Sequence, residues 1–290
     1  PPPFFDGVIG DPTSPSPAIV LAPRGGGKSA QRRQIEIWAP HHKVLAVTYD
    51  RFEFSDAQKF DDIGLSYHLR NIITRLLVAY LSYLQEYPDI IKNIDKNKKK
   101  ALSIYVKSYL GDLSGSALQE ILKELKSLPE KFKDFWAKNV GILESVVNLV
   151  LKKYGLDSID LPDLKQEEKK LNETYKYQLE FLRDLVRQLN FDSIYVLIDK
   201  VDETEKTGNN SLNTYKLLQP LMKDLELLGL EGFGFKFFVW NEILDYFRKD
   251  ARPDRVSQFE ISWTRKQLES VLFKRLKAFS NNKISSMTAK

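Results

Sequence analysis

The chain has 290 residues, of which 42% are hydrophobic, 29% charged and 12% aromatic, and these proportions exclude wholesale disorder, collagen and coiled-coil arrays. Its 44 basic and 39 acidic side chains give a net charge of +5, an excess too small to imply nucleic acid or membrane binding without a local patch. Cysteine is absent and histidine is scarce, which argues against disulfides, thiol nucleophiles, iron–sulfur clusters and zinc sites. No apolar run reaches the roughly 20 residues of a membrane span, so we expect a cytoplasmic protein that does not enter a membrane.

The first part of the chain is expected to form a loop, two strands and a helix. Residues 1–17 are rich in proline, glycine, serine and aspartate, which is typical of a loop. The apolar run Ala18–Leu21 predicts a short strand. A glycine-rich segment comes next, and after it a helical pattern extends to about Trp38. Lys43–Tyr49 predicts a second strand.

A helical block and three further strands follow. From about residue 64 to residue 189 apolar side chains recur at helical spacing, and prolines and glycines divide the stretch into several helices. Strand patterns return at Ser193–Ile198, Gly234–Val239 and Val256–Trp263. The first of these is almost wholly apolar, which is typical of a strand buried on both faces of a parallel sheet.

Strands that alternate with helices predict an α/β fold, built on a parallel sheet flanked by helices. The helical block between the second and third strands is too long for a crossover connection, so we interpret it as an inserted, all-helical subdomain. Because the chain opens on proline, we expect a part of a longer protein, with a C-terminal region that is cut short. The expected organisation is an entry loop (1–17), the first part of the core (18–63), the helical insertion (64–170), the second part of the core (171–265) and the start of a C-terminal helical region (266–290).

The most specific pattern is the segment Ala22-Pro-Arg-Gly-Gly-Gly-Lys-Ser29, between the first strand and its helix. It fits G-x-x-x-x-G-K-[ST] except that Ala22 stands at the first glycine. Glycines let consecutive backbone N–H groups turn toward phosphate oxygens, and the helix N-terminus adds its positive dipole. We expect Lys28 to reach the β- and γ-phosphates and Ser29 to bind Mg²⁺; the alternative is a glycine-rich turn that ends in a surface lysine. The expected phosphate-binding residues are Pro23, Arg24, Gly25, Gly26, Gly27, Lys28, Ser29 and Ala30.

A second signal lies at the end of the third predicted strand. Asp199 follows the buried apolar run there, and Asp202 and Glu203 come within the next four residues. A carboxylate at this place, beside a phosphate loop, is suited to hold Mg²⁺, so Asp199 is the second expected metal ligand. A neighbouring acid would polarise the attacking water as a general base, and the sequence leaves open whether this is Asp202 or Glu203. The alternative is a strand that ends in a polar turn.

Both motifs, with a further strand between the two strands that carry them, resemble the additional-strand branch of P-loop NTPases, which includes the AAA+, STAND and KAP ATPases. The resemblance covers the phosphate loop and roughly residues 190–275, but not the helical block. It implies a parallel sheet in the order 5-1-4-3-2, with nucleotide at the carboxyl ends of the strands. KAP-type and some STAND-type members carry helical insertions between the two motifs, as we expect here.

The segment after the third strand both matches and departs from that branch. The second motif of KAP-type and STAND-type members often reads Asp-x-x-Asp, which Asp199-Lys-Val-Asp202 matches. In typical AAA+ proteins a glutamate follows the first aspartate directly, and here that position is Lys200. The resemblance therefore implies that Asp202 or Glu203 takes over the catalytic acid role, and it leaves the rate of turnover open.

Two further sites follow from the resemblance. Asn241, just past the fourth strand, matches the polar residue that helps AAA+ proteins to orient the attacking water or to contact the γ-phosphate; the alternative is an asparagine that caps the next helix. Arg252 and Arg255 resemble the segment in which AAA+ proteins place an arginine finger, which would reach a neighbouring subunit's γ-phosphate. The alternative for both arginines is a loop with surface charges.

These expectations lead to an ATP-binding, Mg²⁺-dependent ATPase that couples nucleotide state to assembly or conformational change, as a homo-oligomer or with an effector protein. ATP is favoured over GTP because no Asn-Lys-x-Asp segment, which reads guanine, follows Asp199. A first alternative is a nucleotide-gated scaffold with little hydrolysis, which recruits a partner protein through its helical insertion in a defence or signalling complex. A second is a DNA-associated AAA+ motor or loader, for which the basic cluster at residues 96–100 would contact phosphates; that cluster also fits a solvated loop between helices.

Overall fold

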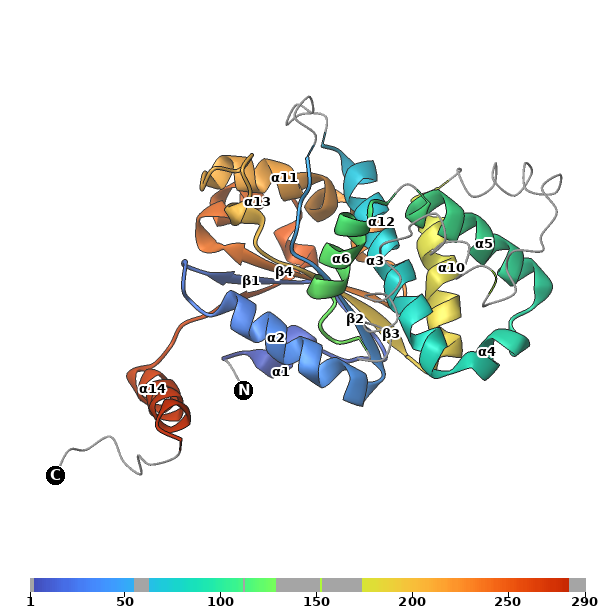
Figure 1. The fold of residues 1–290 in the computed structure, drawn as a ribbon. Helices are drawn as coiled ribbons and strands as arrows, with labels where there is room; N and C mark the ends of the chain where they lie inside the picture. The colour runs from blue at the N-terminus through green and yellow to red at the C-terminus, as the bar shows by residue number, and fades with distance from the viewer. Residues whose placement is uncertain (1–2, 55–62, 112, 129–151, 153–173, 282–290) are drawn as a thin grey trace.

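The structure, a computed structural model, describes residues 3–54, 63–111, 113–128, 152 and 174–281. A parallel sheet forms the centre of this part of the chain (Figure 1). Its strands are β1 (Ala18–Ala22), β2 (Val44–Tyr49), β3 (Ser193–Ile198), β4 (Phe233–Trp240) and β5 (Ser257–Glu260).

Each neighbouring pair of strands is parallel, and the order across the sheet is β2-β3-β4-β1-β5. Read from the β5 edge, this is 5-1-4-3-2. The expected α/β sheet is therefore present, and the carboxyl ends of all five strands lie along one edge. Strand β4 separates β1 from β3, so the two segments that carry the sequence motifs leave the sheet two strands apart.

The predicted extent of the fifth strand, Val256–Trp263, is wrong. Strand β5 covers Ser257–Glu260 and, within the part of the chain that the structure describes, pairs with β1 alone. The N–H of Ile261 still donates to the carbonyl of Leu21, at 2.8 Å. Because β1 turns into the glycine-rich segment after Ala22, the chain beyond Ile261 has no strand left to pair with.

Helices cover both faces of the sheet (Figure 1). On one face, side chains of α1 and α2 pack against alternate residues of the central strands. On the other, α3, α10 and α11 contribute to a larger core. Strands β1, β2 and β3 are buried along their whole length, which explains why their sequences are almost wholly apolar.

The described helices are α1 (Phe5–Ile9), α2 (Lys28–Trp38), α3 (Leu65–Glu86), α4 (Pro88–Asn93), α5 (Lys96–Leu110), α6 (Gly115–Glu124), α10 (Tyr175–Gln188), α11 (Ser211–Lys223), α12 (Leu225–Leu228), α13 (Leu244–Asp250) and α14 (Arg265–Phe279). Single 3₁₀ turns occur at Ala39–His42, Val201–Glu203, Asn241–Ile243 and Pro253–Arg255. Helix α1 lies within the predicted entry loop, so residues 1–17 are not all loop.

The first half of the predicted insertion is helical, from α3 to α6. Buried side chains of α3, α5 and α6 belong to the same core as those of β2, β3 and α10, so this half packs directly on the sheet. Residues 129–151 and 153–170 of the predicted insertion lie outside the described residues. Their helical character stays a prediction.

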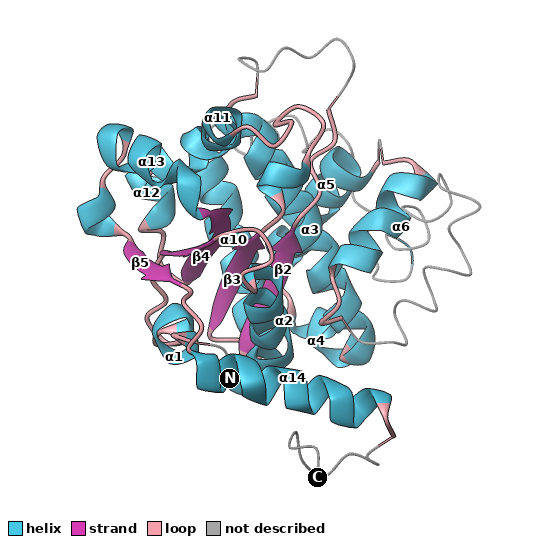
Figure 2. Ribbon diagram, turned by 90° about the vertical axis from the view of Figure 1, so that its left-hand side faces the viewer, coloured by secondary structure: helices cyan, strands magenta, loops and turns pink. Residues whose placement is uncertain are grey.

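Helix α14 runs along the outside of the molecule (Figures 1 and 2). A capping box between Thr264 and Gln267 begins it, and none of its residues is buried. Its apolar side chains Leu268, Leu272 and Leu276 are exposed. Among the residues that the structure describes, no helix combines the length and the apolar character needed to cross a bilayer.

Candidate functional site

The glycine-rich segment forms a tight loop at the carboxyl end of β1. Gly25 and Gly27 have φ angles of 72° and 99°, which glycine adopts without the steric cost that other residues meet. A Cβ atom on Gly26 would lie 2.8 Å from the Cβ of Ala22 and 2.9 Å from the carbonyl oxygen of Pro23. The methyl group of Ala22, where the motif normally has glycine, therefore fits because position 26 carries no side chain.

Lys28 is the first residue of α2 and crosses back over the loop. Its side chain is 9% exposed, and Nζ donates to the carbonyl oxygens of Ala22 and Pro23, at 3.2 and 3.3 Å. An ammonium group has three donors, so one remains for a ligand. Because the first N–H groups of a helix have no intrahelical acceptor, those of Lys28 and Ser29 add to the positive potential here.

Trp263 supports the loop from the outside. Its indole Nε1 donates to the carbonyl oxygen of Gly26, at 2.8 Å. Its ring lies close to Gly27, since a Cβ there would be 3.2 Å from Trp263 Cζ2. The sequence analysis missed this role, and the pattern around Trp263 holds no signal for it.

Asp199 and the loop face one pocket of about 400 Å³. The side chain of Asp199 is 1% exposed at the end of β3, whereas Ser29 is exposed. The residues that line the pocket are Arg24, Gly25, Gly26, Gly27, Lys28, Ser29, Ala30, Asp199, Asp202 and Glu203. The structure thus brings together most of the residues that the two motifs predict; Pro23 is not among the lining residues.

This donor set fits Mg²⁺ bound together with a phosphate group. Mg²⁺ takes one or two protein oxygens and completes its octahedral shell with phosphate oxygens and water, and Ser29 and Asp199 supply a hydroxyl and a carboxylate at the same pocket. Within the described residues no group of three or more carboxylate or imidazole side chains is placed to hold a metal ion by itself. A divalent ion at this pocket therefore needs oxygens from a ligand.

The two candidate general bases differ in their surroundings. The carboxylate of Asp202 is buried, and its Oδ2 lies 3.4 Å from Nε of Arg24. Arg24 also donates to Oδ1 of Asn209 at 2.5 Å, and its guanidinium lies 4.8 Å from the centre of the Trp240 ring. Glu203 is exposed and, among the described residues, forms no ion pair. Asp202 thus ties the phosphate loop to the segment after β3, and Glu203 is left free for a ligand.

Asn241, Arg252 and Arg255 do not line this pocket. Within the described residues the side chain of Asn241 forms no hydrogen bond, and α13 begins without a side-chain cap, so a capping role is not seen. Arg252 and Arg255 are 57% and 68% exposed, and both pair with Asp254. They therefore lie on the surface, outside this pocket.

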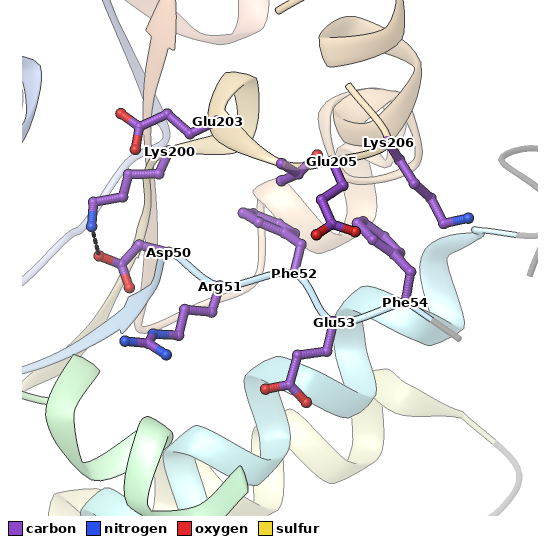
Figure 3. Close-up of a pocket in the computed structure, with 10 residues that line it drawn as sticks. Asp50, Arg51, Phe52, Glu53, Phe54, Lys200, Glu203, Glu205 and Lys206 are labelled. Atoms are coloured by element: carbon purple, nitrogen blue, oxygen red, sulfur yellow. Dashed lines mark ion pairs between the residues drawn. The ribbon is translucent and has the colours of Figure 1, made fainter. Parts of the chain in front are cut away.

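A second pocket, of about 630 Å³, shares Glu203 with the first (Figure 3). Its walls are the segment Asp50–Phe54, which follows β2, and residues of the segment Lys200–Lys206. Lys200 Nζ lies 3.5 Å from Asp50 Oδ2. Lys200 stands at the position where AAA+ proteins have glutamate. Its side chain contacts Asp50, which directly follows the neighbouring strand β2.

A buried histidine lies behind this second pocket. The ring of Phe52 packs at 6.3 Å from that of His68, and burial lowers the pKa of His68 to about 4. The neutral ring must donate from Nε2, because its partner at 2.7 Å is the carbonyl oxygen of Leu217. Nδ1 therefore accepts from the hydroxyl of Tyr49, at 3.0 Å. This pair joins β2, α3 and α11 below the pocket.

The basic cluster at residues 96–100 does not lie in a loop, as one alternative had it. It forms the first turn of α5, which Asp95 caps by accepting from the N–H of Lys98 at 2.9 Å. Lysines at a helix N-terminus oppose the helix dipole, so this turn is not stabilised by its charges. Nothing in its geometry points to a nucleic acid.

The pocket combines the glycine-rich turn after β1, a lysine at the N-terminus of α2 and a buried carboxylate directly after β3. Parts of this kind are suited to bind a phosphate group together with a divalent cation. No protein-family model, no curated protein and no solved structure matches this chain.

Proposed function

We propose that the protein is a Mg²⁺-dependent ATPase with a P-loop NTPase core similar to those of AAA+, STAND and KAP ATPases. One observation carries the proposal: Lys28 and the glycine-rich turn at the end of β1 share a pocket with Asp199 at the end of β3. The sheet order 5-1-4-3-2 supports it, because ligands of open parallel sheets bind at the carboxyl ends of the strands.

In this proposal the chain handles phosphate with charges and backbone groups. The N–H groups of residues 25–29 and the free donor of Lys28 bind phosphate oxygens. Ser29 and Asp199 hold Mg²⁺, which neutralises negative charge on the phosphates when bound. Arg24 lines the same pocket and fixes the position of the loop through Asp202.

Glu203 is the better candidate for the general base. It lines the pocket and has no ion-pair partner among the described residues, whereas the charge of Asp202 is already shared with Arg24. A carboxylate must be free to accept a proton from water if it is to act as a base. Asp202 then serves to hold the loop.

The test is equilibrium binding of a fluorescent ATP analogue in the presence of Mg²⁺. We expect Lys28→Ala to weaken binding by about 100-fold or more, since it removes a buried cation that also braces the loop. Lys277→Ala, which removes an exposed lysine of α14, is the control and should bind like the wild type. Equal affinity of the Lys28→Ala variant and the wild type would contradict the proposal, as would stronger binding of GTP than of ATP.

A nucleotide-gated scaffold with slow hydrolysis is the second candidate. Three polar side chains, those of Lys200, Asp202 and Glu203, follow Asp199 closely in the sequence. Two of them already have ion-pair partners, since Lys200 pairs with Asp50 and Asp202 pairs with Arg24. Steady-state phosphate release separates the candidates: a wild type that binds ATP tightly but releases phosphate no faster than the Glu203→Gln variant is a scaffold.

Coupling to assembly is part of the proposal. Arg252 and Arg255 are exposed and lie outside their own chain's pocket, as arginines that act across a subunit interface must be. Light scattering with and without ATP and Mg²⁺ tests this. If the molar mass rises when nucleotide is added, and if Arg252→Ala or Arg255→Ala abolishes this rise, the result supports coupling to assembly. A molar mass that stays at the value of a monomer contradicts it.

A further inference from the structure

We infer that Arg32 positions the carboxylate of Asp199 and sets the Mg²⁺ concentration that nucleotide binding requires. The inference rests on the proposed function, and it gives a role to a residue that the sequence motifs do not include. Arg32 follows Lys28 by four residues in α2 and so lies on the same face of the helix, one turn farther along.

The contacts of Asp199 show how it is fixed. Arg32 Nε donates to Asp199 Oδ2 at 2.9 Å, and the N–H of Lys200 donates to Asp199 Oδ1, also at 2.9 Å. Among the described residues, Arg32 is the one charged side chain that pairs with Asp199. Each carboxylate oxygen has two lone pairs, so one on each remains available. The carboxylate is thus oriented by the protein without being blocked.

Two further carboxylates fix Arg32 itself. Nη1 lies 2.5 Å from Oε1 of Glu36, and Nη2 lies 3.4 Å from Oδ2 of Asp50. Arg32 is 4% exposed and Glu36 is 1% exposed, and Glu36 also accepts from the hydroxyl of Thr48 at 2.6 Å. Glu36 also pairs with Arg33, and Asp50 with Lys200. A movement of the guanidinium toward a phosphate would therefore leave the buried carboxylate of Asp199 without a charged partner among the described residues, which is strongly unfavourable. Arg32 is therefore held in place beside Asp199, is not among the residues that line the pocket, and is not a phosphate ligand.

The positive charge of Arg32 lowers the affinity of the site for Mg²⁺. A guanidinium in contact with Asp199 offsets much of the negative potential that would attract a divalent cation. The protein part of the site therefore binds Mg²⁺ weakly by itself, and phosphate oxygens must supply the missing charge and ligands. Arg32 thereby makes metal and nucleotide bind together.

The experiment measures binding of a fluorescent ATP analogue as Mg²⁺ is titrated, and takes the Mg²⁺ concentration at half-maximal binding as its readout. Arg32→Gln retains an amide donor but removes the charge, and we expect that concentration to fall about tenfold. Arg32→Lys keeps the charge and should stay within about threefold of the wild type. An equal shift in both variants would overturn the role of the charge.

Glu36→Gln also tests the charge of Arg32, because it removes a carboxylate that pairs with the guanidinium. This variant should raise the Mg²⁺ concentration at half-maximal binding, whereas Arg32→Gln should lower it. Without the charge of Glu36, more of the guanidinium's charge acts on Asp199, so the half-maximal Mg²⁺ concentration should rise about threefold. Thermal melts show which variants fold; if Arg32→Gln does not, the Glu36→Gln variant decides by the same readout. A value that stays at the wild-type level overturns the inference. Failure of the wild type to bind the analogue at any Mg²⁺ concentration would instead contradict the proposed function.

Discussion

The indole N–H of Trp263 donates to the carbonyl oxygen of Gly26, and so ties the segment after β5 to the middle of the phosphate loop. The bond is 2.8 Å long and crosses between parts of the chain that lie 237 residues apart. Since Gly27 also packs on the Trp263 ring, two consecutive residues of the loop are held from outside the pocket. The loop is therefore ordered before any ligand arrives, which lowers the entropic cost of binding.

Trp263→Phe is expected to weaken binding of the ATP analogue by about threefold to tenfold, because it keeps an aromatic ring against Gly27 but removes one hydrogen bond. The same titration that tests Lys28 measures this. Trp38→Phe is a matched control, since Trp38 is a half-buried tryptophan in the second half of α2. An unchanged affinity for Trp263→Phe would show that the bond does not preorganise the loop.

Gly26→Ala is expected to abolish most nucleotide binding while leaving the protein folded. The new methyl group would meet the Cβ of Ala22 at 2.8 Å and the carbonyl oxygen of Pro23 at 2.9 Å, so the loop backbone must shift. Ala22→Gly in the same chain removes one of these two contacts and should restore part of the affinity. Gly64→Ala, where a Cβ has open space, serves as the control.

A result in which the double variant binds no better than Gly26→Ala alone would show that the Pro23 carbonyl, and not Ala22, sets the limit. A Gly26→Ala variant with wild-type affinity would contradict the geometry of the loop itself.

The strands and the glycine-rich turn before α2 were predictable because each depends on a local pattern. Strand β3 has the bounds that its apolar run predicts, since burial on both faces leaves no polar position inside it. The end of β5 depends on its partner β1, which no local pattern reveals. The lysines at residues 96–100 were also compatible with a solvated loop between helices, and the structure instead places them in the first turn of α5, which Asp95 caps.

The candidate site was predictable only where residues are close in sequence. Arg32 stands in a helix in which a charged side chain normally faces water. Its burial results from Asp50 and Asp199, which two different strands bring to it. The pairing of Arg24 with Asp202 likewise depends on the sheet order. The sequence therefore leaves Asp202 and Glu203 as equal candidates for the general base, and the pairing of Arg24 with Asp202 is the observation on which we propose Glu203.

Glu203→Gln and Asp202→Asn are expected to act on different quantities. Glu203→Gln should lower the rate of phosphate release by about 100-fold or more, with little change in ATP affinity, because it removes the free carboxylate. Asp202→Asn should instead weaken ATP binding, since Arg24 loses its ionic partner. Single-turnover rates and equilibrium titrations measure the two effects separately. The reverse outcome, slow turnover for Asp202→Asn alone, would make Asp202 the base.

Lys236 is a buried lysine of β4 that fastens the N-terminal segment. It is 0% exposed, and its Nζ donates to the carbonyl oxygens of Ser16 and Ile9, at 2.8 and 3.3 Å. Nζ also lies 4.8 Å from the centre of the Tyr195 ring, whose hydroxyl donates to the same Ile9 oxygen. Burial lowers the pKa of Lys236 to about 7 from the ordinary lysine value of 10.5, and no carboxylate among the described residues pairs with it to oppose this shift.

The lowered pKa of Lys236 predicts the direction in which stability depends on pH. Between about pH 7 and pH 10.5 the unfolded chain binds more protons at this lysine than the folded chain, so the free energy of unfolding rises with pH there, by at most about 1.4 kcal/mol per pH unit. Below pH 7 both states are protonated and the dependence levels off. Urea unfolding of the wild type and Lys236→Met at several pH values measures this: the wild type should gain stability relative to the variant as pH rises from 7 to 10. Lys249→Met, at an exposed lysine, should show no such trend, and a pH-independent difference for Lys236→Met would mean that the buried amine keeps its ordinary pKa.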